Sequence, residues 1–394
     1  MEQDGTRSRF SQALLAAVIG TLLLVPTPGH ARNFFTVAVI PDTQNYVDSA
    51  NPQPQSLATF LGETRFLAQH RHELKLAFVT HVGDVVQHGD GTNGVAGDAS
   101  WGAGAEWERA AQAIEVLAAS GVPFGLSPGN HDYDSHEYKT GSRPLRGSVM
   151  WTRYFGPESR YFAGKRWYGG ASTDLHNPGM SSYQVFKAAG RRFLHISLEM
   201  EAGDAALAWA QRVIDAHRGD PTIVTTHAFL DPPADTDARL PLEVPAHRIE
   251  ASYLTDSPGG WNGAQEVWEK LIVKNDQIFM VVCGHAWNPT VNGVSVSENV
   301  RIGMNEAGHT VYQVLSDYQG NTSASVGGDG WLRLMEFDLD ARNIHFTTFS
   351  PVRDQRAGQR GEWTFNQPPT FSDFTLPMPV QVVHSTARRQ AKDD

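Results

Sequence analysis

Five short polar blocks in this sequence each follow an apolar run and together offer carboxylate, imidazole and amide groups. The blocks are Asp42-Thr43-Gln44, Gly83-Asp84, Gly129-Asn130-His131-Asp132, Thr226-His227 and Gly284-His285. Such a mixture of oxygen and nitrogen ligands without thiolates suits Fe, Zn or Mn better than soft metal ions. The carboxyl ends of parallel strands meet at one edge of a sheet, so we expect the five blocks to converge there and form a metal site.

Each block taken alone also has a structural explanation. An aspartate after a strand is usually a turn or cap residue, and a lone histidine such as His227 is usually structural. The block Gly129–Asp132 is harder to explain in this way, because four polar, turn-forming residues directly follow an apolar run. Because five such ends occur in one order, the sequence favours a functional site over five unrelated turns.

The elements that must position these blocks follow from hydrophobic periodicity. Apolar runs of strand length, continuous as in strands that are covered on both faces, occupy Phe34–Ile40, Leu76–Thr80, Pro123–Leu126, Phe193–Leu198, Thr222–Thr226 and Phe279–Cys283. Helical stripes between them occupy Ser56–His72, Ala105–Ser120, Asp204–Arg218 and a segment from a predicted cap at Asn262 to about Lys274. Residues 331–349 read as a terminal hairpin. Alternating strands and helices predict an α/β fold.

The five blocks, in this order, resemble the signature of the calcineurin-like metallophosphoesterase superfamily, in the variant whose first block reads Asp-Thr-Gln. The resemblance covers roughly residues 34–350. It implies a four-layer αββα sandwich that presents two metal ions from the loops after the sheet strands. By the same resemblance Asp42 and Gln44 would serve the first metal, Asp84 would bridge both, and Asn130, His227 and His285 would hold the second.

The reaction implied is hydrolysis of a phosphate mono- or diester by a hydroxide that bridges the two metals. Two metals about 3.5–4 Å apart can lower the pKa of such a water and neutralise phosphoryl charge. His131 would be the catalytic histidine, which protonates the leaving alkoxide or stabilises the phosphoryl group. Asp132 would orient His131, although a role as a turn cap explains it equally well.

Two positions depart from the superfamily pattern. Gln44 stands where the first block usually carries histidine, and an amide oxygen is a weaker ligand that favours harder metals. Trp287 stands where the last block usually has a second histidine, so the first metal lacks one protein ligand. Asn288, His309 or water are the candidates for that place. These departures motivate an alternative function, a catalytically weak or inactive phosphatase-fold protein that binds its partner without turnover.

Composition limits the partners and the compartment. With 32 basic and 43 acidic side chains among 394 residues, a broad basic footprint for nucleic acid is not expected. A phosphorylated small molecule or polymer stays compatible, because bound cations set the local field. The single cysteine, Cys283, excludes an internal disulfide.

Residues 1–31 read as a signal peptide, with Arg7 and Arg9 before a short apolar run and small residues at 29–31. We therefore expect an exported protein, periplasmic or secreted, with no stable membrane span after removal of the signal. The remaining chain divides into a metallophosphoesterase domain at 32–352 and a partly disordered C-terminal extension at 353–394.

Overall fold

A computed structural model describes most of the chain after residue 32. The described ranges are 33–48, 56–90, 104–134, 147–173, 177–232, 261–286, 288–291, 294–296, 298–319, 328–352 and 372–383. All of them belong to one compact unit, residues 33–394. The predicted signal peptide at 1–31 and the end of the predicted C-terminal extension lie outside these ranges. No helix among the described residues combines the length and the apolar character needed to cross a membrane.

The first sheet has six strands in the order β15-β14-β13-β1-β2-β3. Its strands are β1 (Phe34–Ile40), β2 (Leu76–His81), β3 (Phe124–Leu126), β13 (Leu332–Asp338), β14 (Asn343–Phe349) and β15 (Asp373–Pro377). β1, β2 and β3 run parallel, whereas β13 joins β1 in the antiparallel sense. The carboxyl ends of the three parallel strands therefore reach one edge together.

The second sheet has seven strands in the order β11-β12-β8-β7-β6-β5-β4. Its strands are β4 (Tyr168–Ala171), β5 (Ser182–Ala188), β6 (Arg191–Ser197), β7 (Thr222–Thr225), β8 (Ile278–Cys283), β11 (Glu298–Met304) and β12 (Thr310–Ser316). The four central strands β6, β7, β8 and β12 are parallel. A separate small ladder pairs β9 (Asn288–Val291) with β10 (Val294–Val296).

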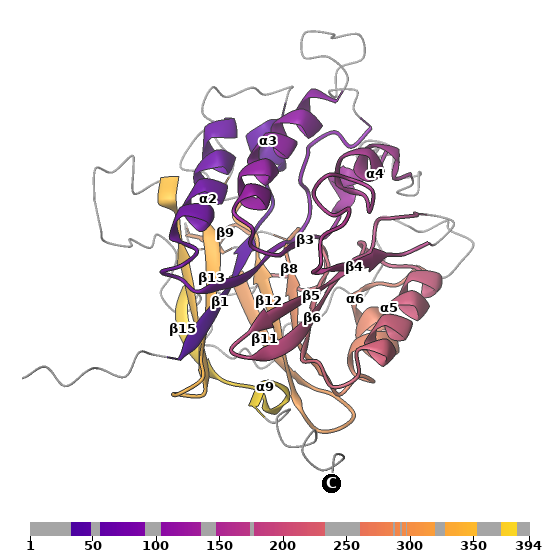
Figure 1. Ribbon diagram of the computed structural model, residues 1–394, viewed down its shortest axis with the longest axis vertical. Coiled ribbons are helices and arrows are strands. Elements are labelled where there is room, and N and C mark those ends of the chain that lie inside the picture. The colour runs from indigo at the N-terminus through magenta and orange to yellow at the C-terminus, as the bar shows by residue number, and fades with distance from the viewer. Residues whose placement is uncertain are drawn as a thin grey trace, which may run out of the picture. The chain divides into compact units, whose positions relative to one another are not determined.

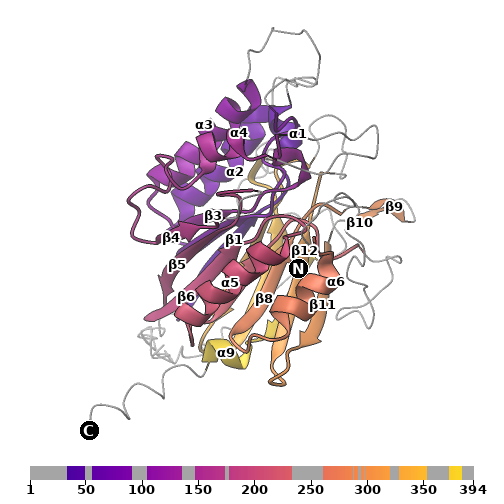
Figure 2. The ribbon, with the colours of Figure 1, turned by 90° about the vertical axis from the view of Figure 1, so that its right-hand side faces the viewer.

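Helices cover the outer faces of both sheets (Figures 1 and 2). On the first sheet lie α1 (Gln44–Val47), α2 (Ser56–His70), α3 (Ala105–Ala119) and α4 (Val149–Phe155), with residues such as Phe60 and Trp107 in one apolar core. On the second sheet lie α5 (Asp204–Ala216) and α6 (Ala264–Val267), which continues as the π-helical turn η2 (Trp268–Ile272).

A third core lies between the two sheets and holds them face to face. It contains Phe35 and Phe78 of the first sheet with Phe186 and Phe193 of the second. The ring centroids of Phe78 and Phe186 are 4.7 Å apart, and those of Phe35 and Phe193 are 5.3 Å apart. With helices outside each sheet, the predicted four-layer αββα sandwich is confirmed.

The structure differs from the sequence-based elements in a few places. Gly263, not Asn262, is the N-cap residue of α6, because the Asn262 amide donates instead to the carbonyl of Ala202 at 2.7 Å. Strands β5, β11 and β12 were not predicted. Within the predicted extension, β15 pairs with β14 and α9 (Val380–Val383) follows it. The domain boundaries themselves stay predictions.

The buried carboxyl group of Glu63 on α2 should lower the stability of the folded protein, and this effect can be tested. Its side chain is buried, and neither carboxyl oxygen has a hydrogen-bond partner among the described residues. Burial raises its pKa well above the usual range, so the folded state retains a proton that the unfolded state releases above about pH 4.3. Stability should therefore fall as pH rises. We predict that Glu63→Gln stabilises the protein by about 1–3 kcal/mol at pH 8 and much less at pH 5.

Urea unfolding of both proteins in chelator at the two pH values measures this difference. Parallel pH profiles for wild type and variant would contradict the prediction.

Candidate metal centre

The carboxyl ends of parallel strands from both sheets meet at one place. The backbone amide of Val82, after β2, donates to the Ile40 carbonyl of β1. The amide of Gly284, after β8, donates to the His227 carbonyl at 2.9 Å. Between the sheets, Thr80 of β2 donates its hydroxyl to that of Thr225 on β7 at 2.8 Å. The loops after β1, β2, β7 and β8 are therefore joined into a single shell.

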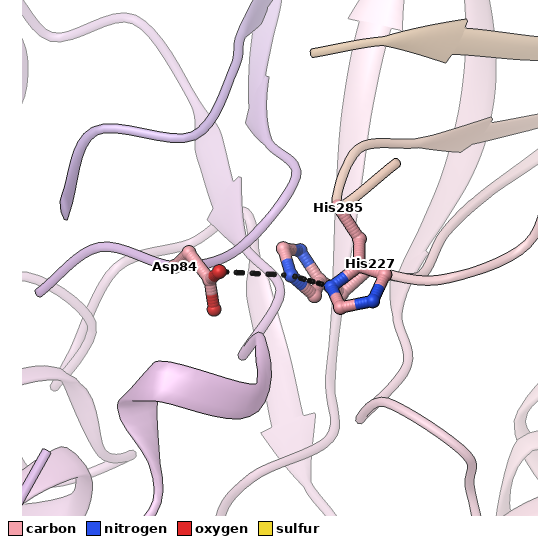
Figure 3. A group of neighbouring side chains, drawn as sticks. All are labelled: Asp84, His227 and His285. Carbon is pink, nitrogen blue, oxygen red and sulfur yellow. Dashed lines mark hydrogen bonds and ion pairs between the residues drawn. The ribbon is translucent and has the colours of Figure 1, made fainter. Parts of the chain in front are cut away.

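Asp84, His227 and His285 form the centre of this shell (Figure 3). Their nearest nitrogen and oxygen atoms all lie within 4.8 Å of one another. The His227 Nε2 atom is 3.2 Å from Asp84 Oδ2 and 3.2 Å from His285 Nδ1. His227 Nδ1 lies 3.0 Å from the Val82 carbonyl, which only accepts, so Nδ1 donates there and Nε2 is turned toward the centre.

Asp42 and Gln44 join the group from the end of β1. The Asp42 Oδ1 atom accepts the backbone amide of His285 at 3.1 Å and lies 3.7 Å from His227 Nδ1. The Gln44 amide nitrogen donates to Asp84 Oδ2 at 3.2 Å and to Gln319 Oε1 at 2.6 Å. Both side chains are about 2% exposed. The structure thus brings together five of the six predicted metal ligands through direct contacts.

Asn130, the sixth predicted ligand, arrives with the 3₁₀ turn η1 (Asn130–Asp132) after β3 and is fully buried. His131 in the same turn donates its backbone amide to Asp84 Oδ1 at 2.9 Å. Its ring Nδ1 lies 2.9 Å from the Gln87 carbonyl and donates to it, which leaves Nε2 3.9 Å from Asp84 Oδ2. His131 is therefore held at the rim of the centre by its neighbours.

Asp132 contributes differently from the expectation that it orients His131. Its Oδ1 accepts the backbone amides of Val85 and Val86 at 2.8 and 3.1 Å, and its Oδ2 accepts that of Gly129 at 2.8 Å. The ring of His131 is oriented by the Gln87 carbonyl instead. Asp132 thus ties the loop after β2 to the loop after β3, which fits the alternative reading of a turn cap.

Backbone conformation at the centre is unusual. Asp84 and His285 have positive φ angles of 51° and 70°, a region that non-glycine residues seldom occupy, and Gly83 has φ 119°. Left-handed conformations cost about 1–2 kcal/mol per non-glycine residue and gather at functional sites. The aspartate at position 84 and the histidine at position 285 are therefore present although their backbone conformations are unfavourable.

The charges of the buried side chains at this site depend strongly on one another. Burial by itself disfavours a charged His227, yet the carboxylates of Asp84 and Asp42 raise its pKa to about 9. Burial by itself would raise the pKa of Asp84, but the charge of His227 holds it well below the usual range. Burial and the charge of Asp317 raise the pKa of Asp42 well above its usual range. A proton on His227 thus supplies positive charge that the buried carboxylates require.

These residues fit a bound metal. Asp42 Oδ2 and Gln44 Oε1 are buried oxygens with no hydrogen-bond partner among the described residues, and buried polar atoms normally have one. The glycines beside the ligands leave no room for a side chain. A Cβ at Gly284 would stand 2.3 Å from Asp42 Oδ2, and one at Gly129 would stand 2.2 Å from Asp84 Oδ1. Donor types, unpaired oxygens and close backbone approach all suit a cation.

The family model for calcineurin-like phosphoesterases matches residues 35–288, which include the six predicted metal ligands and both His131 and Asp132. The chain belongs to this family. Within the matched region lies the group Asp84, His227 and His285, whose atoms could hold a metal ion. The Asp-Thr-Gln subgroup stays a prediction.

Individual relatives are distant. The uncharacterized protein YvnB of Bacillus subtilis (strain 168) is 25% identical over 326 residues, which are 82% of this chain and 20% of that protein. The chain therefore spans about a fifth of the length of the curated relative it matches.

Solved structures with a similar fold include a dimetal phosphatase from Danio rerio, at 11% identity and a TM-score of 0.43, with coverage of 88% of this chain and 99% of that one. The NAD nucleotidase of Haemophilus influenzae matches at 11% identity and a TM-score of 0.33, with coverage of 82% and 48%. The phosphoesterase YfkN of Bacillus subtilis matches at 11% identity and a TM-score of 0.38, with coverage of 85% and 94%.

The place of the missing last histidine in this metallophosphoesterase is partly resolved. His309 does not fill it, since it precedes β12 at the amino end of the sheet, where its ring contacts Asp276. Trp287 and the side chain of Asn288 lie outside the described residues. Sequence reasoning missed Asp317 and Gln319, which follow β12 and reach Gln44. The available signal was the same as elsewhere, a carboxylate directly after an apolar run.

Asp48, His88 and Glu106 form a second group of potential ligands, in which Glu106 has a structural role. Glu106 accepts the backbone amides of Gln87 and His88 at 3.0 and 2.8 Å and also contacts the His88 ring at 2.8 Å. Its carboxylate therefore fixes the segment that carries the Gln87 carbonyl, on which His131 depends.

Gly284→Ala tests the tight approach at the centre. The added Cβ would meet Asp42 Oδ2 at 2.3 Å and Val82 at 2.5 Å, so Asp42 must move. We predict a loss of about 1–3 kcal/mol in stability together with a lower metal content per chain. Elemental analysis after gel filtration, combined with urea unfolding, gives both quantities.

The control is Gly190→Ala, in the turn between β5 and β6. Gly190 has φ 74°, and no atom lies within 4 Å of the place that an added methyl group would take, so alanine there costs about 1 kcal/mol without touching the centre. Equal metal content in Gly284→Ala and wild type would refute the role of this glycine.

Proposed function

We propose that this metallophosphoesterase hydrolyses phosphate mono- or diesters at a dinuclear metal site with water as the nucleophile. The observation that carries the proposal is the meeting of Asp84, His227 and His285, with all ligand atoms within 4.8 Å, at the shared edge of two sheets. Buried carboxylates and imidazoles at this spacing are stabilised by cations. Divalent or trivalent Fe, Zn or Mn suits the donor set.

In this proposal Asp42 and Gln44 would hold the first metal, and Asp84 would contribute to both metals. Asn130, His227 and His285 serve the second. When bound, the two cations supply a hydroxide nucleophile at neutral pH and neutralise the charge that develops on the phosphoryl group. The unpaired oxygens of Asp42 and Gln44 and the inward Nε2 atom of His227 support this division.

His131 is the proposed general acid. Because Nδ1 donates to the Gln87 carbonyl, the Nε2 atom is the one that can hold a proton toward a leaving alkoxide. Its backbone amide holds Asp84 at 2.9 Å, so the ring keeps a constant position relative to the bridging carboxylate. Asp132 acts as a positioning residue, since its carboxylate joins the two loops that carry Asp84 and His131.

The site of action that we propose is outside the cytoplasm, in the periplasm or the medium. The basic start, short apolar run and small residues at 29–31 support export. The substrate is a phosphorylated compound, and the net charge of −11 argues against a nucleic-acid polymer.

The first test combines metal analysis with an activity screen of protein from residue 32 onward. We predict about two metals per chain and metal-dependent hydrolysis of an aryl phosphate or a bis-aryl phosphate. A chelator should abolish turnover, and Mn, Fe or Zn should restore it. A fully loaded protein that is inert toward every ester would favour the binding-protein alternative.

The second test separates the proposed roles of His131 and Asp84. His131→Ala should lower turnover about 10²–10⁴-fold, the usual contribution of a general acid, while metal content stays near that of wild type. Asp84→Asn should lose both metal and turnover. If the two variants lose metal to the same extent, the separate role of His131 is wrong.

A further inference from the structure

Asp317 occupies a sixth strand end at the metal centre. β12 runs parallel to β8 with Leu315 opposite Cys283, and two residues beyond that pair stand Asp317 and His285. Adjacent strands lie about 4.8 Å apart, so Asp317 leaves its strand beside the residue that enters the centre from β8. Its side chain is completely buried.

A hydrogen-bonded chain joins Asp317 to the first block. Gln319 donates its backbone amide to Asp317 Oδ1 at 3.0 Å and its side-chain nitrogen to Asp317 Oδ2 at 2.9 Å. The Oε1 atom of the same Gln319 side chain accepts the Gln44 amide at 2.6 Å. Because the Gln44 nitrogen is held in this way, its Oε1 atom is left for another partner, and it has none among the described residues.

The segment around Asp317 is anchored between the sheets. Arg333 of β13 donates from Nε to the Ser316 hydroxyl at 2.8 Å and pairs through Nη2 with Glu298 at 2.6 Å. Tyr318 donates its hydroxyl to the same Glu298 carboxylate at 2.5 Å. All these side chains are buried. Ser316 and Tyr318, on either side of Asp317, are thus held in place by hydrogen bonds. A binding site requires such fixed neighbours so that its side chains are already positioned when a ligand binds.

Three buried carboxylates thus follow strands that end at this edge. Asp42, Asp84 and Asp317 are 2%, 1% and 0% exposed, and the ion pairs described for Asp42 and Asp84 are with histidines. Several buried charges of one sign are costly unless cations compensate them. The buried Asp42 Oδ2 atom, which has no hydrogen-bond partner in the part of the chain that the structure describes, indicates where a cation could bind.

We propose that Asp317 supplies a carboxylate to the first-metal subsite, in the place that the missing last histidine would take, and that Gln319 aligns both Asp317 and Gln44. This inference rests on the proposed dinuclear function. The first subsite is then made of oxygen donors from Asp42, Gln44, Asp84 and Asp317, whereas the second retains two imidazoles. An all-oxygen subsite favours harder cations such as Mn²⁺ over Zn²⁺.

Asp317→Asn in the full chain tests the proposal by metal binding alone. The change keeps size and removes charge. We expect binding of Mn²⁺ to fall from about two ions to about one per chain, or the weaker site to lose more than about 100-fold in affinity, beyond the 10–100-fold usual for residues that only support a ligand. Isothermal titration and elemental analysis measure this. Gln319→Leu, which leaves the carboxylate, should lose only about 10–100-fold.

Thermal unfolding separates a metal carboxylate from a structural one. In chelator, Asp317→Asn loses one buried like charge but also one of the two acceptors for Gln319, so the deciding quantity is the rise in Tm on adding Mn²⁺, which should be smaller than in wild type. A variant that gains as much from Mn²⁺ as wild type would overturn the proposal. So would two ions bound with wild-type affinity.

The matched control is Asp338→Asn. Asp338 is also a buried aspartate, and its Oδ1 accepts the amides of Asp340 and Ala341 at 3.0 and 2.8 Å, but it lies at the other end of the first sheet, opposite Phe34. The Asp338→Asn variant should bind both metals.

If wild type binds one Mn²⁺ and Asp317→Asn weakens the binding of that ion, Asp317 stands as a ligand and the dinuclear function fails. If wild type binds no metal of any kind, both proposals fail.

Discussion

The buried contact between Asp84 and His227 is the interaction on which the rest of the site depends. Asp84 follows β2 in the first sheet and His227 follows β7 in the second, and their side chains meet at 3.2 Å. Such a meeting requires that two sheets pack face to face with their parallel strands ending at a common edge. The phenylalanine-rich core between the sheets meets this requirement, because it sets their separation and alignment. A cation bound at this edge would therefore draw ligands from both halves of the sandwich.

Much of the surrounding structure holds this contact in place at a local cost. Asp84 and His285 both adopt left-handed backbone conformations, and a buried aspartate, Asp132, is devoted to three backbone amides of the adjoining loops. Glu106 likewise accepts backbone amides of the segment that orients His131. Unfavourable backbone conformations and buried carboxylates of this kind are typical of functional sites. They are compensated by the large apolar cores on either face of each sheet.

The departures from the family pattern acquire a physical sense in the same arrangement. Gln44 replaces an imidazole by an amide, whose nitrogen is held by Gln319 while its oxygen is left for the centre. Gln319 also donates a hydrogen bond to Asp317. The residues that follow β1 and β12 are therefore joined by one chain of hydrogen bonds. A centre with more oxygen ligands at one subsite has a different metal preference from one with an extra histidine, without any change of fold. If Asp317 serves as proposed, these departures would make a variant centre and not a damaged one.

The sequence by itself determined the local pieces. The apolar runs predicted β1 with its bounds as observed, and β2, β7 and β8 to within a residue or so, because strands buried on both faces must be continuously apolar. The polar blocks after them, and the order of those blocks, predicted the family and the group around Asp84.

Only the tertiary structure decided which groups meet. The sequence did not predict β5, β11 and β12, although β5 and β12 are largely buried. Because β12 was not predicted, Asp317 was not predicted either. Asp317 looks like an ordinary turn residue until its strand is placed beside β8. The hydrogen-bond partners of Asp132 and the distant place of His309 likewise became visible only in the fold, since a side chain's partners depend on strand order and register. Register and strand order arise from packing across the whole sandwich, and no short stretch of sequence encodes them.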